Sequence, residues 1–372
     1  MTQAAQIGLL IQTNWTYGRG IFRGLIRYAH RHQRWTFHKM ANDGRVDAKL
    51  RLQGIIGHIA SPEVEANIRR LGVPLINVSA LSRDVQCLRV IPDNLAVGRI
   101  GAEHLLSMGY RQIAFVGHTR HYYADVRAEG FLAAADKAGV KARHYLISNL
   151  ADLTPAIQQI KRQGPKVGVM CANDQLAGSF SDACAAAGVR VPDDVALIGV
   201  DNDDIFCELA QPSLSSIELG TERLGQTAGE VLARMMAGEV APTGETLVPP
   251  IGVVRRASSD TWACADEDVA AGLRYIRDHV QEGIQVKQML AHLAVSRRTL
   301  ERRFLEVLGR SPAEEIRRIR IERVCSALAN TNDSLASIAK SYGFINAKEL
   351  SKTFCRQVGQ TPTAYRAKFR TL

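Results

Sequence analysis

Polar and aromatic side chains follow the first apolar segment that we predict to be a buried strand. This segment, Ile7–Ile11, runs into Gln12-Thr13-Asn14-Trp15-Thr16-Tyr17, which combines amide groups with two aromatic rings. The apolar face of a sugar packs well on an aromatic ring, while amides and carboxylates hydrogen-bond to its hydroxyls. Trp15 and Tyr17 are therefore candidate ligand contacts. Packing of Trp15 beneath a helix is an equally good interpretation.

Amide and acidic side chains follow two further predicted strands. Asn173-Asp174 follows the strand that ends at Cys171, and Asp201-Asn202 follows the strand that ends at Val200. Taken singly, an Asn or Asp at a strand-to-helix turn is more often an N-cap than a ligand contact. Arg127, at the start of a predicted helix, would also suit a surface position. The residues alone leave both interpretations open.

Two of the three acidic residues Asp93, Asp174 and Asp201 could in principle form a general acid and base pair of an enzyme. No nucleophile–base arrangement, metal-ligand spacing or phosphate-binding loop accompanies them. The seven cysteines are scattered and form no CxxC pair, so neither a zinc site nor a disulfide framework is predicted. We therefore expect a binding protein with no metal or cofactor, and not an enzyme.

Short apolar runs alternate with amphipathic helical stretches up to about residue 256. The predicted strands are Ile7–Ile11, Gly54–Ile59, Pro74–Val78, Ile113–Gly117, Lys166–Cys171 and Val195–Val200. The predicted helices are Arg23–His32, Val97–Met108, Arg127–Ala138, Ala156–Arg162 and Gln175–Ala187. This alternation predicts parallel sheets flanked by helices, arranged as two lobes with a cleft between them. Ligands bind such sheets at the carboxyl ends of the strands, where the polar residues above lie.

The net positive charge is confined to the last quarter of the chain. Residues 284–372 hold 17 Lys and Arg against 7 Asp and Glu, whereas the other 283 residues hold 30 of each sign. A neutral body joined to a basic module indicates a ligand-sensing part and a separate part that binds the phosphate groups of nucleic acid. No apolar run approaches the ~20 residues that span a bilayer, and the first residues lack a secretory signal. We expect a cytoplasmic protein with no membrane partner.

The basic module contains two helix-turn-helix patterns. In the first, Ser296 is a suitable N-cap for a helix in which Leu300 and Phe304 face inward. The outward face, which would enter a major groove, then carries Arg298, Glu301 and Arg302. Glu301 would either contact a base or orient Arg302.

The second pattern repeats the first fifty residues later. Leu350 and Phe354 face inward, and Lys348, Ser351 and Lys352 face outward. A capping box, Ser311-Pro312-Ala313-Glu314, begins the helix between the two patterns. That helix should run for ~18 residues, roughly 27 Å, and would hold the two DNA-reading units a fixed distance apart.

Several motifs of the body resemble LacI/GalR-type sensor domains. They are His104–Gly117, Asn173–Ala177, Val191–Asp201 and Gly225–Ala228. The resemblance implies that Asp93, Arg127, Asn173 and Asp201 hold a sugar or another small ligand. We expect no DNA-binding headpiece before this sensor, because the first sensor strand is predicted to begin at about residue 6.

The same pattern predicts the domain boundaries. We expect an α/β sensor at 5–256, with lobe one at about 5–100 and 219–247 and lobe two at about 101–212 and 248–256. A linker at 257–265 and an all-α double helix-turn-helix domain at 266–372 should follow. Three crossings between the lobes make a hinge, which lets a ligand bias an open–closed equilibrium.

The order of features in the basic module resembles the AraC family. The resemblance rests on Ser296…Leu300…Phe304, Ile338-Ala339…Gly343-Phe344 and Gly359-Gln360-Thr361-Pro362…Tyr365-Arg366. It implies that Arg298, Glu301 and Arg302 read one half-box of double-stranded DNA. The second half-box would be read by Ala347, Lys348, Ser351 and Lys352.

A LacI-type sensor followed by an AraC-type module resembles the XylR-type xylose operon regulators. This resemblance implies a sugar-responsive transcription regulator that binds DNA as a homodimer and activates pentose catabolism genes, with D-xylose as effector and RNA polymerase as a further partner. The alternatives are a repressor, or a regulator that responds to a different sugar or metabolite. A sugar-binding transport protein and an enzyme are more remote alternatives.

Overall fold

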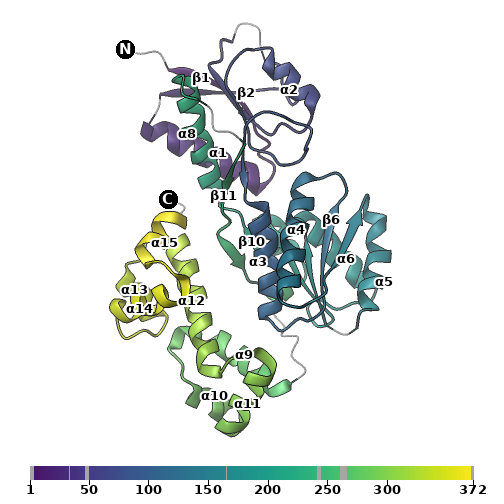
Figure 1. The fold of residues 1–372 in the computed structure, drawn as a ribbon, viewed down its shortest axis with the longest axis vertical. Helices are drawn as coiled ribbons and strands as arrows, with labels where there is room; N and C mark the ends of the chain where they lie inside the picture. Colours follow the sequence, from purple (N-terminus) through teal and green to yellow (C-terminus); the bar gives the residue numbers. More distant parts are fainter. Residues whose placement is uncertain are drawn as a thin grey trace. The chain divides into compact units, whose positions relative to one another are not determined.

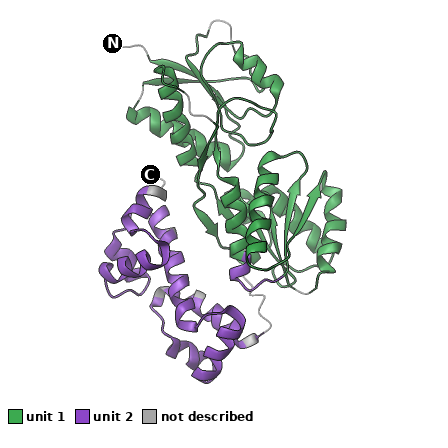
Figure 2. Cartoon of the chain, viewed as in Figure 1, with its two compact units in different colours: residues 1–104, 112–260 green, residues 105–111, 261–372 purple. Residues whose placement is uncertain are grey.

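The computed structural model describes residues 4–32, 34–46, 50–164, 166–240, 244–259 and 266–369. The chain divides into two compact units, coloured separately in Figure 2. One unit comprises residues 1–104 and 112–260, and the other comprises residues 105–111 and 261–372. The first unit contains both predicted lobes, and the second contains the basic module.

Lobe one is built on a six-stranded parallel sheet with strand order β11-β5-β4-β3-β1-β2. Its strands are β1 Ala5–Leu10, β2 Trp35–Lys39, β3 Gly54–Gly57, β4 Leu75–Asn77, β5 Arg89–Pro92 and β11 Glu245–Val248. Its helices are α1 Thr16–His32, α2 Pro62–Arg69 and α8 Thr221–Met236. All six strands end at one edge of the sheet, and the loops that follow them meet there (Figure 1).

The helices α1 and α8 pack closely against each other on one face of the lobe-one sheet. A Cβ atom added to Gly24 would lie 1.9 Å from the Glu222 carbonyl oxygen, and one added to Gly225 would lie 2.1 Å from that of Ile21. The two glycines therefore permit this close approach. Ile21, Leu224 and Leu232 are fully buried in the core beneath the two helices. Helix α8 packs in the core of lobe one although it follows lobe two in the chain.

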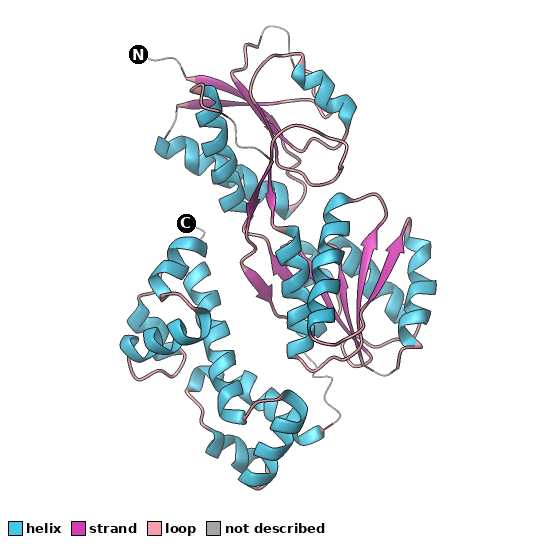
Figure 3. Cartoon of the chain, viewed as in Figure 1, coloured by secondary structure: helices cyan, strands magenta, loops and turns pink. Residues whose placement is uncertain are grey.

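Lobe two has the same architecture, with strand order β12-β10-β9-β8-β6-β7. Its strands are β6 Ile113–His118, β7 Arg143–Ile147, β8 Val167–Cys171, β9 Val195–Val200, β10 Ser215–Glu218 and β12 Gly252–Val254. Only β12, at one edge of this sheet, runs antiparallel to its neighbour. Helices flank the sheet (Figure 3), namely α3 Asn94–Ser107, α4 Tyr122–Lys137, α5 Leu153–Lys161, α6 Asp174–Ala186 and α7 Asp204–Leu209, with a short 3-10 turn, η1 Leu150–Asp152, before α5.

The chain crosses between the lobes after β5, after β10 and after β11. The first crossing lies near residue 93, earlier than the predicted boundary at 100, because α3 already packs in lobe two. A Cβ atom on Gly98 of α3 would lie 1.9 Å from the carbonyl oxygen of Arg127. Hydrogen bonds join the crossing segments, from Asp93 N to the Val248 carbonyl (2.8 Å) and from Ile251 N to the Glu218 carbonyl (2.8 Å).

The predicted linker begins later than expected. Residues Ala257–Ser259 form a 3-10 turn, η2, in which Ser258 and Ser259 are fully buried. The Ser258 hydroxyl donates to the Leu197 carbonyl (2.6 Å), so this turn belongs to lobe two. Residues 260–265, the rest of the predicted linker, lie outside the described residues.

The second unit contains the two predicted helix-turn-helix pairs. Its helices are α9 Glu267–His279, α10 Val286–Leu293, α11 Arg297–Leu308, α12 Pro312–Asn330, α13 Leu335–Ser341, α14 Ala347–Val358 and α15 Pro362–Phe369, with a 3-10 turn, η3 Val280–Glu282, after α9. The predicted capping box forms at the start of α12, where Ser311 and Glu314 cap each other's backbone. Leu350, Phe354 and Tyr365 share one core with Ile338.

The secondary structure differs from the prediction mainly at short elements. All six predicted strands are present, whereas β2, β5, β7, β10, β11 and β12 were not predicted. These strands are only three to five residues long, and most of them include polar or charged residues, so they give no continuous apolar run. Helix α1 begins at Thr16, seven residues before the predicted start at Arg23. None of the described helices is long and apolar enough to cross a membrane.

Candidate functional site

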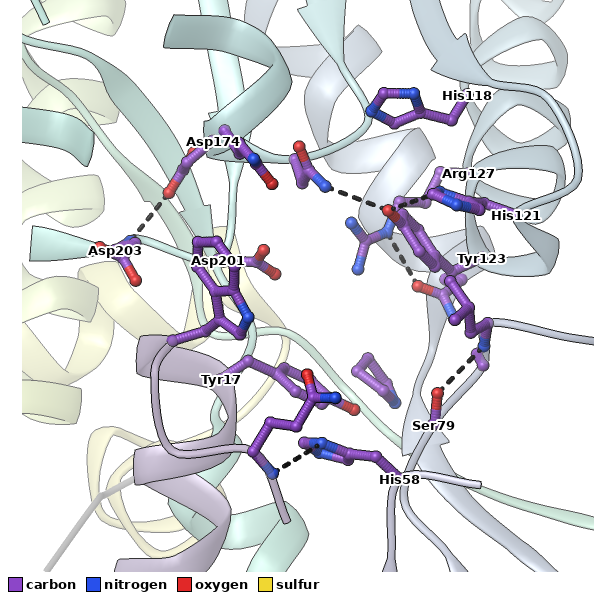
Figure 4. A pocket seen from close by; sticks show the side chains of 18 of the residues that line it. Tyr17, His58, Ser79, His118, His121, Tyr123, Arg127, Asp174, Asp201 and Asp203 are labelled. Carbon is purple, nitrogen blue, oxygen red and sulfur yellow. Dashed lines mark hydrogen bonds between the residues drawn. The ribbon is translucent and has the colours of Figure 1, made fainter. Parts of the chain in front are cut away.

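A cavity of about 320 Å³ lies between the two lobes, at the carboxyl ends of both sheets. Figure 4 shows the side chains that converge on it from the loops after β1, β3 and β4 and from the corresponding loops of lobe two. Of the seven predicted ligand-binding residues, six line this cavity: Trp15, Tyr17, Arg127, Asn173, Asp174 and Asp201. The parallel topology brings these residues together, because it gathers the strand ends at one edge.

Asp93 does not line the cavity and is replaced there by its neighbour. The Asp93 carboxylate accepts a hydrogen bond from Ala96 N (2.9 Å) and caps the start of α3. Asn94 lines the cavity instead and is 5% exposed. Asp93 therefore takes the capping role that the sequence had left open for acidic residues at such turns.

Arg127 is held in place by three interactions. Its Nε donates to Asn94 Oδ1 (2.9 Å), its Nη1 donates to the Ala172 carbonyl, and its guanidinium lies 4.8 Å from the centre of the Tyr123 ring. The side chain is almost fully buried. None of the described residues accepts a hydrogen bond from Nη2, so this nitrogen remains available to a ligand.

Asp201 is the carboxylate best placed to accept from a ligand. Its backbone has a φ of +111°, a strained conformation that directs the residue toward the cavity. Burial raises the pKa of Asp201 to about 6, while Arg127 lowers it and Asp203 raises it. Among the described residues, none donates a hydrogen bond to this carboxylate.

Asp174 lines the cavity, but its carboxyl group is used within the protein. One oxygen accepts from Asp203 N (2.8 Å), and the other lies 2.6 Å from the Ser216 hydroxyl. Burial, followed by the charge of Asp201, raises the pKa of Asp174 to about 8. At neutral pH the group is therefore mostly protonated, and its geometry is that of an internal support for the loop that carries Asp203.

Asn173 has both a capping and a bridging role. Its Oδ1 accepts from Leu176 N (2.8 Å), as an N-cap of α6 does, and its Nδ2 donates to the Tyr123 hydroxyl (3.0 Å). Tyr17 donates its hydroxyl proton to the Val78 carbonyl (2.8 Å) within lobe one. Both residues thus shape the cavity wall, with their polar atoms already paired.

Three histidines and Tyr123 line the cavity although none of them was among the predicted ligand contacts. His58 follows β3, whereas His118 and His121 precede α4, and all three line the cavity. Isolated histidines have no characteristic spacing, so only their place after a strand would have marked them. Burial lowers the pKa of His58 to about 4, and burial also lowers the pKa of His118 and His121.

The lobes also contact each other around the cavity. Asp203 of lobe two accepts a hydrogen bond from Thr16 N of lobe one (2.9 Å), and Asp204 lies 3.3 Å from Arg19. At another edge of the cavity, Tyr123 N donates to the Ala80 carbonyl (2.8 Å). These contacts join the lobes around the polar groups described above.

In the second unit, α11 presents the first set of predicted DNA-contacting residues. The Ser296 hydroxyl caps the helix by accepting from Thr299 N (3.1 Å). Leu300 and Phe304 are fully buried, which leaves Arg298 and Arg302 exposed. Basic side chains on the exposed face of the second helix of such a pair are suited to a DNA groove.

Glu301 does not orient Arg302. Its carboxylate pairs with Arg297 (2.8 Å), whereas Arg302 pairs with Glu306 (2.9 Å). Both pairs join residues four apart on the exposed surface of α11. Such pairs contribute little to stability, so Arg302 can leave Glu306 for another acceptor at low cost.

Helix α14 presents the second set of predicted DNA-contacting residues. Lys348 and Lys352 are exposed, while Ala347 and Ser351 are half-buried on the same helix. Asn346 caps the helix by accepting from Glu349 N (2.9 Å). The Glu349 carboxylate in turn accepts from Ile345 N (2.7 Å), one residue before the cap.

The chain is similar to known regulators along its whole length. Residues 102–259 match the model of the periplasmic binding protein-like domain family, and residues 289–368 match that of the helix-turn-helix domain family. The xylose operon regulatory protein of Haemophilus influenzae is 26% identical over 386 aligned residues, which cover 98% of both chains. The protein is a DNA-binding transcription regulator with a sugar-sensor domain.

A further curated relative supports this assignment, and a solved structure shows the shared fold. The regulator is also 26% identical to the xylose operon regulatory protein of Escherichia coli, over 98% of this chain and 97% of that one. A solved structure of the xylose-binding transcription activator XylR covers all of both chains, with a TM-score of 0.62 and 24% identity, and therefore shares the fold. The predicted fold class is confirmed. Because the relatives are regulators, the assignment is to a DNA-binding regulator and not to an enzyme.

Proposed function

We propose that the cavity between the lobes binds an aldopentose, D-xylose, as the effector of this regulator. The observation that carries the proposal is that Arg127, with Nη2 unused, and the Asp201 carboxylate line the same cavity of about 320 Å³. One supplies a donor and the other an acceptor, and a sugar hydroxyl can serve either. The names of the full-length relatives support xylose as the specific sugar.

In this proposal, Asp201 accepts hydrogen bonds from two neighbouring hydroxyls, and Arg127 donates to a third oxygen. The indole of Trp15, which lines the cavity and is partly exposed, covers the apolar face of the sugar ring. The walls therefore provide the polar and aromatic groups that a sugar site uses. Because these residues come from both lobes, the effector favours the arrangement in which the lobes are joined.

The output is activation of transcription by a cytoplasmic homodimer. Arg298, Glu301 and Arg302 read one half-box, and Ala347, Lys348, Ser351 and Lys352 read the other. The exposure of the basic members of these sets, Arg298, Arg302, Lys348 and Lys352, on the two second helices supports this assignment. The effector would alter how the paired modules are presented to DNA and to RNA polymerase. A full shift from 1:99 to 99:1 requires about 5.5 kcal/mol of differential affinity.

A thermal-shift panel tests the effector. Purified protein is heated with D-xylose, other aldopentoses, hexoses and purines. A ligand at 100 times its dissociation constant stabilises the native state by about 2.7 kcal/mol. We expect a shift with xylose. A shift with a different compound alone would retain a sensing role and reject xylose.

A second experiment tests the output. Promoter DNA is titrated with the protein, with and without the sugar, and transcription from that promoter is then measured. We expect the sugar to raise transcription. A sugar-dependent decrease would identify a repressor, and equal binding by the Arg302→Ala variant would reject the assigned reading face.

A further inference from the structure

A groove of about 400 Å³ lies in the DNA-binding unit, between the two helix-turn-helix pairs. Its walls come from α10 and α11 of the first pair, from the connecting helix α12, and from α14 of the second pair. Figure 1 shows α12 running between the two pairs. We call this feature the inter-motif groove. None of the seven predicted DNA-contacting residues, all of them among the described residues, lines it.

Two glycines form the base of the inter-motif groove. Gly283, before α10, and Gly343, after α13, both have a left-handed backbone, with φ of +70° and +69°. A Cβ atom added to Gly343 would lie 2.1 Å from Gly283 Cα, so only glycine permits this contact. The residues that follow them, Ile284 and Phe344, are buried and line the groove. The two pairs therefore meet directly at the base of the groove.

The inter-motif groove is strongly basic. Its charged lining residues are four cations and one acid, namely Lys287, Arg297, Arg317, Arg320 and Glu349. Lys287 and Arg317 are exposed and have no ion-pair or hydrogen-bond partner among the described residues. Arg297 pairs with Glu301 on the exposed surface of α11, a contact that contributes little to stability. Three cations are thus available to a ligand, and such a set suits a polyanion.

Arg320, the fourth cation, supports the wall of the groove. Its Nη2 donates to the Ile284 carbonyl and so ties α12 to the segment before α10. Burial lowers the pKa of Arg320, while the charge of Glu349 acts in the opposite direction. The acid that lines the groove therefore offsets the most buried of the four cations. The positive charge of the exposed cations remains for a ligand.

Both second helices border the inter-motif groove. Arg297 is the first residue of α11, whereas Glu349 and Thr353 lie on α14. A duplex that presents one major-groove segment to α11 and the next to α14 must pass the groove between them. The sugar–phosphate backbone on either side of the intervening minor groove then faces the protein. Phosphates of the DNA are therefore the anions that reach the three exposed cations.

We propose that the inter-motif groove binds phosphate groups of the DNA backbone between the two half-boxes, with Lys287, Arg297 and Arg317 as the donors. This inference rests on the proposed reading faces of α11 and α14 and adds a site outside them. Phosphate contacts carry no sequence information, but they fix the register of a duplex on a protein. Because the groove lies between the two pairs, such contacts hold both half-boxes against their reading helices.

The test uses the full-length protein and a duplex that this protein selects from a random-sequence pool. Fluorescence anisotropy measures affinity for this duplex and for a scrambled one over a range of salt concentrations. We expect Arg317→Gln to weaken binding to both duplexes by a similar factor, about tenfold. The dependence of log affinity on log salt should become less steep by about 0.9.

Two further variants separate the charge of Arg317 from a general effect of charge. Arg317→Lys keeps the positive charge and should keep the salt dependence of wild type. Arg274→Gln removes an exposed cation of α9 that does not line the groove, and it is the matched control. We expect this control to bind both duplexes within about twofold of wild type.

Neutral linkages locate the contact on the DNA. A single methylphosphonate replaces one phosphate at a time between the half-boxes of the selected duplex. We expect one or two positions at which the neutral linkage weakens binding of wild type about tenfold but does not further weaken binding of Arg317→Gln. This non-additivity identifies a direct contact, because a structural defect would add to the loss at every position.

The outcomes distinguish this inference from the proposed reading faces. The inference is overturned if Arg317→Gln matches Arg274→Gln in affinity and salt dependence, or if it loses affinity for the selected duplex alone. Normal DNA binding with a loss of transcription would instead make the groove a contact for RNA polymerase. Retained preference for the selected duplex in Arg302→Ala would reject the assigned reading face of α11. An unchanged unfolding temperature shows that each variant is folded.

Discussion

Trp15 of lobe one and Phe206 of lobe two stack on each other beside the cavity, with ring centroids 5.7 Å apart and planes inclined by 20°. Both residues line the cavity, and the indole is 38% exposed. The contact lies next to the Asp203–Thr16 hydrogen bond, which also joins the lobes. The stack therefore stabilises the lobe arrangement that encloses the effector.

Removing this stack should weaken effector binding. An aromatic pair contributes about 1 kcal/mol beyond its area, so Phe206→Ala should raise the dissociation constant about fivefold. Leu209→Ala, at an exposed position on the same helix, is the matched control and should bind normally. Calorimetric titration measures both. Equal affinity of Phe206→Ala and wild type would show that the stack plays no part in binding.

Effector affinity should fall below about pH 6 because Asp201 must be ionised to accept from two hydroxyls. Burial raises the pKa of this carboxyl to about 6 in the empty cavity. Below that pH, binding must release a proton, and affinity falls by at most about tenfold per pH unit. Asp201→Asn should bind weakly at all pH values and lose this dependence. Wild-type affinity that is constant from pH 5 to pH 8 would contradict the role.

Asp174→Asn should stabilise the sensor at pH 7, whereas Asp174→Ala should destabilise it. Burial raises the folded-state pKa of Asp174 to about 8, far above that of an unfolded Asp, so folding at pH 7 requires proton uptake. The stability contribution is present at low pH and is lost as pH rises toward 8. Asn keeps both hydrogen bonds without this dependence.

The Ala variant would leave Asp203 N and Ser216 without their partner and should lower the unfolding free energy by about 1–3 kcal/mol. Urea unfolding at pH 5 and pH 7 measures both variants. The advantage of Asn over wild type should grow with pH over that interval. A difference that shrinks with rising pH would mean that Asp174 is ionised in the folded protein.

Removing Glu306 should strengthen DNA binding. Arg302 pairs with Glu306 at 2.9 Å, and both side chains are more than half exposed. Glu306→Gln frees Arg302 and removes a negative charge from the basic face, so DNA affinity should rise by a few-fold, most clearly at low salt.

The Arg302→Ala variant should weaken specific DNA binding by about 1–3 kcal/mol and relax the preference at one base pair. Fluorescence anisotropy with operator and scrambled DNA measures both effects, and a loss of affinity in Glu306→Gln would show that the pair is part of the reading surface.

Glu315 should be the most sensitive charged residue of the DNA-binding unit. It is fully buried and pairs with Arg318 (2.8 Å) and Arg310 (3.4 Å). Burial opposes the charge on Arg318, but Glu315 and Glu322 raise its pKa. Glu315→Ala leaves these guanidinium groups without their shared buried partner and should cost about 3–5 kcal/mol. Glu314→Ala, at the exposed neighbouring position, should cost about 1 kcal/mol through loss of the capping box. Thermal unfolding compares the two, and equal losses would contradict the burial argument.

The sequence alone determined the features that depend on local patterns. Alternating apolar runs and helices predicted two parallel sheets, because buried parallel strands are continuously apolar. The capping box at Ser311 and the i,i+4 pairs Leu300–Phe304 and Leu350–Phe354 predicted the helices of the DNA-binding unit and their exposed faces. Short half-buried strands such as β2 lacked this signal and were missed.

Only the tertiary structure decided which atoms face the cavity. Neighbouring residues at a strand end are equivalent in the sequence, yet Asp93 caps α3 while Asn94 reaches Arg127. Asp174 forms a hydrogen bond with Ser216, forty-two residues away in the chain. His58 accepts one from Gln12 N, forty-six residues away. The protonation and direction of these groups depend on burial and on partners that long-range packing supplies, and no local spacing encodes either.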